Sequence, residues 1–239
     1  MIKICGPISL LLLGLFSLAL SVLNVAVYAD ESTVKLDKAA IDVTDLASLQ
    51  RGAALFMNHC SGCHSLKFMR YSTMAQGIGI TDAAGHVLEQ AVQDNLMFVG
   101  DKITDTIQSA MTKEEGATWF GIAPPDLSLE ARLRGVDWIY TYLRTFYLDN
   151  KKQWGVNNKV FPDVAMPDVL YSFRERLLAE KDGQAKYDMA VLDLVNFLAY
   201  VSEPMQETRK RIGLWVMLFL SVFFIFAWLL KREYWKDVH

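Results

Sequence analysis

Two cysteines and two histidines lie close together in the segment N-H-C-S-G-C-H-S, which runs from Asn58 to Ser65. Its centre, Cys60-Ser-Gly-Cys63-His64, places two thiols three residues apart and an imidazole directly after the second thiol. Thiols at this spacing occur in redox dithiols, zinc sites, iron–sulfur ligand sets and haem attachment sites. The whole chain holds only 3 cysteines and 4 histidines, which restricts the choice.

A covalent haem is the interpretation that uses all three side chains of the motif. A structural zinc site with four cysteine ligands is impossible here, because too few cysteines are present. A thioredoxin-like dithiol expects a βαβ context, and a disulfide between residues three apart would leave His64 without a role. In haem attachment, the two thiols add to the vinyl groups and the histidine binds iron.

A second iron ligand must come from elsewhere, and Met166 is the favoured candidate. It lies in A-M-P-D, within an irregular loop where Pro162 and Pro167 restrict the backbone. His86 is the rival, and Met74, Met97 and Met111 also remain open. Methionine opposite histidine would raise the reduction potential of the haem compared with two histidine ligands. With both axial positions of the iron filled, electron transfer is favoured over oxygen chemistry.

Further residues are expected around the cofactor. The carbonyl of Pro124 or Pro125 is expected to accept the second ring N–H of His64. Arg132 and Arg134 either pair with a haem propionate or lie on an exposed helix surface. Aromatic side chains that supply bulk near the haem or in the core are Tyr71, Trp119, Phe120 and Trp138.

Residues 1–29 have the layout of a cleaved secretory signal. A basic residue precedes an apolar run, and V-Y-A at residues 27–29 provides small residues at a cleavage site. An uncleaved membrane anchor is the alternative. Export places Cys60 and Cys63 in a compartment where thiols oxidise.

Residues 209–232 are expected to form a transmembrane anchor. The run 212–230 contains no charge and, at about 1.5 Å per residue, covers roughly the 30 Å core of a bilayer. Basic residues flank both ends, so the signal sets the orientation: residues 30–208 lie outside and residues 233–239 inside. The chain is thus predicted to be a single-pass protein of a bacterial inner membrane with a periplasmic domain.

The charge of the exported domain limits its partners. Acidic side chains outnumber basic ones within residues 30–208, although the whole chain carries a net charge of only −3. An acidic surface disfavours nucleic acid and suits a soluble partner with a basic face, and it is also compatible with ordinary solubility.

Helical periodicity predicts a mainly α fold. One helix is expected at 45–60, leading into the cysteine motif, and another at 185–202, with Met189, Leu192, Val195, Leu198 and Ala199 on its apolar face. Helices are also expected near 101–112 and 128–147. Strand signals are weak, and the long loops between these helices need a central group to organise them.

Several separated segments together resemble the cytochrome c1 family, the haem subunit of quinol:cytochrome c oxidoreductase, or cytochrome bc1 complex. They are C-S-G-C-H-S-L-K-F-M-R-Y at 60–71, W-F-G-I-A-P-P-D-L-S at 119–128, F-P-D-V-A-M-P at 161–167, and R-K-R-I-G at 209–213. The set spans nearly all of the chain after the leader.

The resemblance implies a cytochrome-c-like domain, enlarged by insertions, on one C-terminal membrane helix. It implies one haem c held by Cys60 and Cys63, with His64 and Met166 as axial ligands. One of Arg132 and Arg134 would serve a haem propionate, while Tyr71 and Pro125 are the further residues expected next to the haem or its ligand.

The partners implied are cytochrome b in the lipid bilayer, a Rieske iron–sulfur protein as donor and a cytochrome c as acceptor. The chain would be an electron relay without a bond-making active site of its own. Some bacterial members of the family brace the methionine loop with another cysteine pair, which this chain lacks. Alternative interpretations are a membrane-tethered cytochrome c that serves another enzyme, and a membrane-anchored thiol-disulfide oxidoreductase.

Overall fold

A computed structural model describes residues 34–236 of the chain. The predicted signal at 1–29 and the end of the predicted tail lie outside the described residues. The chain divides into two units, Met1–Lys35 and Leu36–His239, and the second contains the elements below.

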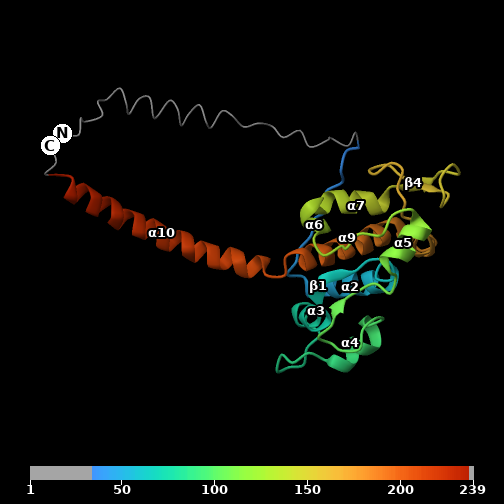
Figure 1. Ribbon diagram of the computed structural model, residues 1–239, viewed down its shortest axis with the longest axis horizontal. Helices are drawn as coiled ribbons and strands as arrows, with labels where there is room; N and C mark the ends of the chain where they lie inside the picture. The colour runs from blue at the N-terminus through green and yellow to red at the C-terminus, as the bar shows by residue number, and fades with distance from the viewer. Residues whose placement is uncertain (1–33, 237–239) are drawn as a thin grey trace. The chain divides into compact units, whose positions relative to one another are not determined.

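Two long helices form the centre of the domain. Helix α2 (Leu46–His59) packs along α9 (Gly183–Ser202), and the two run side by side in Figure 1. The helices approach closely at Gly52, where an added Cβ atom would lie 2.1 Å from the backbone oxygen of Asp193. Phe56 and Phe197 meet beside this crossing, with ring centroids 5.8 Å apart. The contact fixes the helix that carries the cysteine motif.

Both helices begin and end close to their predicted bounds. The Asp45 carboxylate caps α2 by accepting a hydrogen bond from the Ser48 backbone N–H. The predicted apolar face of α9 is wrong at Met189, whose exposed fraction is 60%. The buried face is instead centred on Val191, Leu194 and Val195, because α9 packs against α2 on one side and α7 (Val136–Arg144) on another.

The remaining helices of the domain are short. Their bounds are Tyr71–Gly77 (α3), Glu89–Leu96 (α4), Lys113–Phe120 (α5), Glu130–Leu133 (α6) and Tyr171–Leu178 (α8). Helices α6, α7 and α8 pack against α9. Helix α4 packs against α3 and α2, and α3 and α4 lie together below α2 in Figure 1. The predicted continuous helix at 128–147 is wrong, because Gly135, at φ +86°, separates α6 from α7.

Two small antiparallel sheets complete the domain. One pairs β1 (Leu66–Arg70) with β2 (Thr106–Ile107), and the other pairs β3 (Phe146–Leu148) with β4 (Val156–Asn158). The helix predicted near 101–112 is wrong, because this segment forms a loop and then β2. The Asp105 carboxylate accepts both backbone N–H groups of Asp101 and Lys102, which closes the loop. The mainly helical fold class is nevertheless confirmed.

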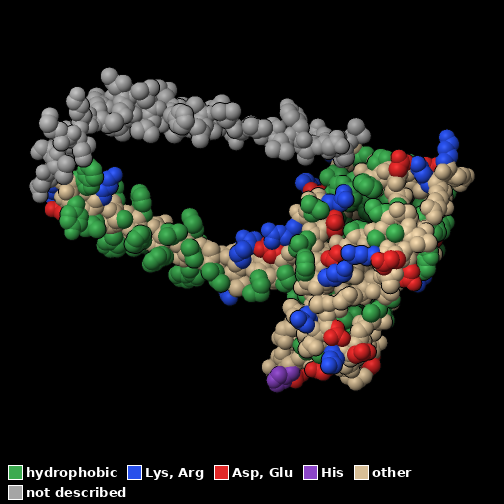
Figure 2. Space-filling view, viewed as in Figure 1, with side chains coloured by type: hydrophobic (Ala, Val, Ile, Leu, Met, Phe, Trp, Pro, Cys, Tyr) green, Lys and Arg blue, Asp and Glu red, His purple; other side chains and the backbone are tan. Residues whose placement is uncertain are grey.

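Helix α10 (Gln206–Tyr234) contains the predicted membrane segment. It is long and apolar enough to cross a bilayer, and within residues 34–236 no other helix meets these criteria. Figure 2 shows hydrophobic side chains along its length and Lys or Arg side chains near both ends. Its length and composition agree with a single-pass anchor.

Candidate haem site

The cysteine motif forms a tight turn at the end of α2. The Cys60 and Ser61 N–H groups both donate to the Phe56 carbonyl, and the Cys63 and His64 N–H groups both donate to the Cys60 carbonyl. This turn presents the two thiols and the imidazole from one short stretch. Cys60 is buried and Cys63 is half-buried.

The environment of the thiols does not suit a redox dithiol. Burial raises the pKa of the Cys60 thiol to about 12, and burial also raises the pKa of Cys63. A reactive dithiol needs a lowered pKa, because the thiolate is the nucleophile. The burial of the thiols, which raises both pKa values, therefore disfavours the thiol-disulfide oxidoreductase hypothesis.

His64 is oriented by the P-P-D-L-S segment, as the sequence predicted. Its Nδ1 atom lies 2.8 Å from the Pro125 carbonyl oxygen, to which it donates when that nitrogen carries the proton. This hydrogen bond leaves Nε2 available for a metal. Burial lowers the pKa of the ring, and the Pro125 carbonyl opposes that change.

Two side chains that the sequence reasoning missed attach P-P-D-L-S to the motif. Asp126 accepts a hydrogen bond from the Lys67 N–H at 2.9 Å, and the Ser128 hydroxyl accepts one from the Phe68 N–H at 3.2 Å. The Leu127 N–H donates to the Ser65 carbonyl at 2.9 Å. These bonds hold the Pro125 carbonyl beside His64, and the D-x-S pattern directly after P-P is the signal that could have identified them.

Met166, the favoured second ligand, lies half-buried against the hydrophobic core. Its Sδ atom is 3.4 Å from the Tyr142 hydroxyl, which donates to it from α7. Tyr142 is stacked on Trp138, with ring centroids 5.0 Å apart. Burial raises the pKa of Tyr142, although the nearby Arg134 acts in the opposite direction.

Arg134 connects the His64 and Met166 surroundings. It pairs with Glu130 at 3.0 Å, and Glu130 is near enough to His64 to influence its pKa. Its guanidinium also lies 4.5 Å from the ring centroid of Trp138 and 5.5 Å from that of Phe161. Arg134 therefore lies between Glu130 on α6 and the aromatic side chains that surround Tyr142 on α7.

Two buried asparagines brace the loop that carries Met166. The Asn158 Oδ1 atom accepts the backbone N–H groups of Val160 and Phe161, and its Nδ2 donates to the Tyr142 carbonyl at 2.7 Å. The Asn157 Oδ1 atom accepts the N–H of Asp163, which has a left-handed backbone at φ +61°. These side chains brace the loop in addition to the restriction that Pro162 and Pro167 place on its backbone.

Three other residues named in the sequence analysis, Arg132, Tyr71 and His86, make their contacts with residues outside the cysteine motif and the Met166 loop. The Arg132 guanidinium pairs with Glu203 at 3.6 Å. Tyr71 is buried at the start of α3, and its hydroxyl donates to the Val99 carbonyl. The side chain of the rival ligand His86 is 81% exposed and lies beside Asp82, in a loop.

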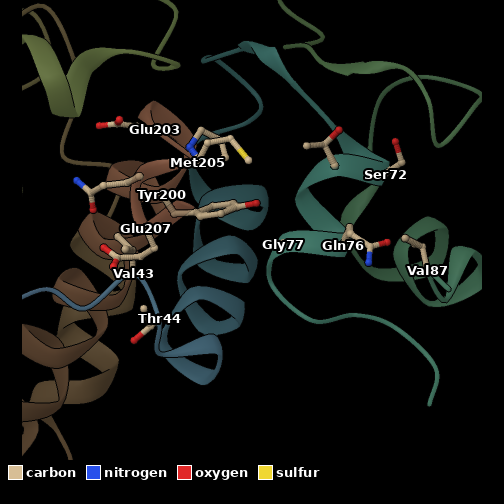
Figure 3. Close-up of a pocket in the computed structure, with 13 residues that line it drawn as sticks. Val43, Thr44, Ser72, Gln76, Gly77, Val87, Tyr200, Glu203, Met205 and Glu207 are labelled. Carbon is tan, nitrogen blue, oxygen red and sulfur yellow. The ribbon is translucent and has the colours of Figure 1, made fainter. Parts of the chain in front are cut away.

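A separate groove of about 590 Å³ lies between α3 and the junction of α9 with α10. Figure 3 shows the Tyr200 ring directed toward Gly77 in this groove, and Glu203 on another part of its wall. No residue of the cysteine motif lines it. Within residues 34–236, no cluster of three or more His, Cys, Asp or Glu side chains suits a metal ion.

The residues present fit a covalent haem. Two thiols stand at the attachment spacing, an imidazole has one nitrogen engaged and one available, and a thioether lies on a braced loop. Arg134 lies near this loop and carries the charge that would complement a haem propionate. One histidine and one methionine suit the axial positions of a haem iron. Structural zinc is disfavoured, because within residues 34–236 Cys60, Cys63 and His64 are not part of a cluster that could hold a metal ion by itself.

Comparison with known proteins agrees with this chemistry. The model of the Cytochrome C1 family matches residues 36–238. The cytochrome c1 of Allochromatium vinosum is 46% identical over 85% of this chain and 90% of its own length. A protein of Nitrosomonas europaea named ammonia monooxygenase gamma subunit is 43% identical over 86% and 90%, and the Rhodospirillum rubrum cytochrome c1 is 30% identical over 81% and 83%. The chain therefore belongs to the cytochrome c1 family of haem-carrying electron-transfer subunits of the bc1 complex.

Proposed function

We propose that this chain carries one haem c, joined to Cys60 and Cys63, with His64 and Met166 as axial ligands, and relays single electrons from a Rieske iron–sulfur protein to a cytochrome c. The haem supplies the one-electron couple. The observation that carries the proposal is the His64–Pro125 hydrogen bond, which leaves Nε2 available at a motif with two thiols.

The side chains perform distinct tasks in this proposal. Cys60 and Cys63 fix the cofactor, while the Pro125 carbonyl holds the plane of the His64 ring. Arg134 is the preferred propionate partner, because it lies next to the Met166 loop whereas Arg132 pairs with Glu203. Tyr71 and Pro125 support the site through the β1–α3 region and the P-P-D-L-S segment.

The test of attachment is a haem stain on a denaturing gel, together with a reduced-minus-oxidised spectrum of membranes. The wild-type chain should retain a c-type pigment after denaturation. Replacing Cys60 and Cys63 with alanine should abolish the stain, and His64→Ala should abolish maturation or low-spin ligation. A normal spectrum in His64→Ala would reject the ligand scheme.

The test of partnership is purification of the tagged full-length protein from membranes. Cytochrome b and a Rieske protein should co-purify, and reduced quinol should reduce the haem in the purified assembly. Recovery with a terminal oxidase instead would favour the tethered-cytochrome interpretation. Recovery with a monooxygenase, as the name of the Nitrosomonas europaea relative suggests, would also contradict the proposal.

We further propose the layout of the chain across the membrane: residues 1–29 as signal, 30–208 as the periplasmic haem domain, 209–232 as the anchor and 233–239 as the cytoplasmic tail. The apolar α10 with basic flanks supports a single crossing. Protease added to spheroplasts should digest the haem domain, whereas the same domain should be protected in inverted membrane vesicles. The reverse pattern would contradict this orientation.

A further inference from the structure

The Tyr142 side chain is held in one place by contacts on several sides. Its ring stacks on Trp138 at an interplanar angle of 10°, and it meets the edge of Phe146 at a centroid distance of 5.2 Å. The Asn158 amide donates to its backbone carbonyl at 2.7 Å. A side chain fixed by two rings and a backbone bond can direct its hydroxyl at a single acceptor.

That acceptor is the sulfur of Met166. The Tyr142 hydroxyl lies 3.4 Å from Sδ, within the range for a hydrogen bond to sulfur. Asn158 bonds to both Tyr142 and the backbone of residues 160–161, which fixes the position of the tyrosine relative to the loop. Tyr140, on the same helix, places its hydroxyl 3.5 Å from the Asp188 carbonyl instead.

We propose that Tyr142 is a positioning residue that raises the reduction potential of the haem by donating a hydrogen bond to the Met166 sulfur. The inference rests on the proposed role of Met166 as axial ligand. A hydrogen bond withdraws electron density from the sulfur, so the thioether becomes a weaker donor to iron. Oxidised iron depends more on electron donation from its ligand than reduced iron does, so a weaker donor destabilises the oxidised state more and the reduction potential rises. Hydrogen bonds to sulfur ligands tune the reduction potential at other iron sites.

The experiment compares haem-loaded, full-length protein with and without this hydroxyl. In Tyr142→Phe, the ring contacts with Trp138 and Phe146 are retained and only the donor is lost. Potentiometric titration should show the oxidised-to-reduced equilibrium shifted toward the oxidised form by about two- to tenfold, the range expected for one hydrogen bond. The haem stain and the sulfur-to-iron charge-transfer absorption should persist.

Tyr140→Phe is the matched control, because it removes a hydroxyl from the same helix without touching Met166. Its potential should equal that of the wild type. An unchanged or raised potential in Tyr142→Phe would overturn the inference. Should that variant fail to acquire haem, a ring-fluorinated tyrosine at position 142 serves instead: the stronger donor should raise the potential, and no change would overturn the inference.

Met166→Leu separates this inference from the proposed function. Loss of the charge-transfer absorption with a marked fall in potential would uphold the axial ligand, so that a null result for Tyr142→Phe would count against Tyr142 alone. An unaltered absorption and potential in Met166→Leu would reject the ligand assignment and the tyrosine inference together.

Discussion

The Nδ1 atom of His64 and the carbonyl oxygen of Pro125 lie 2.8 Å apart, although 61 residues separate them in the chain. The bond joins the cysteine motif to P-P-D-L-S, two of the segments on which the family resemblance rests. A proline carbonyl suits this task because proline restricts its own backbone. Changing the Pro125 side chain would leave the acceptor in place, so the relationship is better tested through the residues that hold the segment.

Asp126→Ala should weaken the hold of this segment on the motif. The carboxylate accepts the Lys67 and Ser128 backbone N–H groups, each at 2.9 Å, and both would lose their partner. The free energy of unfolding should fall by about 1–3 kcal/mol, as measured by denaturant titration of the haem-loaded protein in detergent. The control is Asp94→Ala, which removes an exposed carboxylate on α4 that accepts from Gln90. Equal stability of the two variants would contradict the bracing role of Asp126.

Arg134→Gln and Arg132→Gln should affect the haem differently. Arg134 lies near Tyr142 and Phe161, so removal of its positive charge should favour the oxidised haem and lower the reduction potential. Arg132 pairs with Glu203, so its removal should change the potential less and should instead weaken the contact between α6 and the end of α9. Potentiometric titration of both variants checks the order, and a larger fall in Arg132→Gln would assign the propionate to that residue.

Local sequence signals predicted part of the fold and of the site. Helical periodicity and a capping residue predicted α2 within one residue at each end, and the long apolar run predicted α10. Met189 was misplaced because every side of α9 carries apolar residues, so periodicity alone does not choose the buried face. The Tyr142–Met166 bond and the bond from Asn158 to the Tyr142 carbonyl join residues that the tertiary fold brings together, so no local pattern predicted them. The bonds from Asn158 to Val160 and Phe161 are local, and an asparagine that accepts backbone N–H groups two and three residues on is a recognised turn signal.

Asn158→Ala should loosen the Met166 loop. Asn158 is 1% exposed, and its side chain satisfies the Val160 and Phe161 N–H groups and the Tyr142 carbonyl. Leaving these groups unpaired should reduce the free energy of unfolding by about 2 kcal/mol or more. The sulfur-to-iron charge-transfer absorption should also disappear at a lower temperature than in the wild type. Asn95→Ala on the exposed side of α4 is the control, and a shared melting temperature for this absorption would argue against the brace.

Gly52→Ala should disturb the crossing of α2 and α9. The added Cβ atom would lie 2.1 Å from the Asp193 backbone oxygen and 2.7 Å from the Phe197 Cβ atom, so the two helices would have to separate. Alanine favours a helix more than glycine does, but overpacking at a backbone contact outweighs this gain and should cost about 1–3 kcal/mol. Ala54→Ser adds one atom on the exposed face of α2 and should leave the free energy of unfolding within about 0.5 kcal/mol of the wild type.

Because α2 ends at the cysteine motif, Gly52→Ala should also reduce the yield of protein that retains haem on a denaturing gel. Wild-type stability and haem yield in Gly52→Ala would show that the helices tolerate a wider separation. The close approach of α2 and α9 would then not be required to position Cys60.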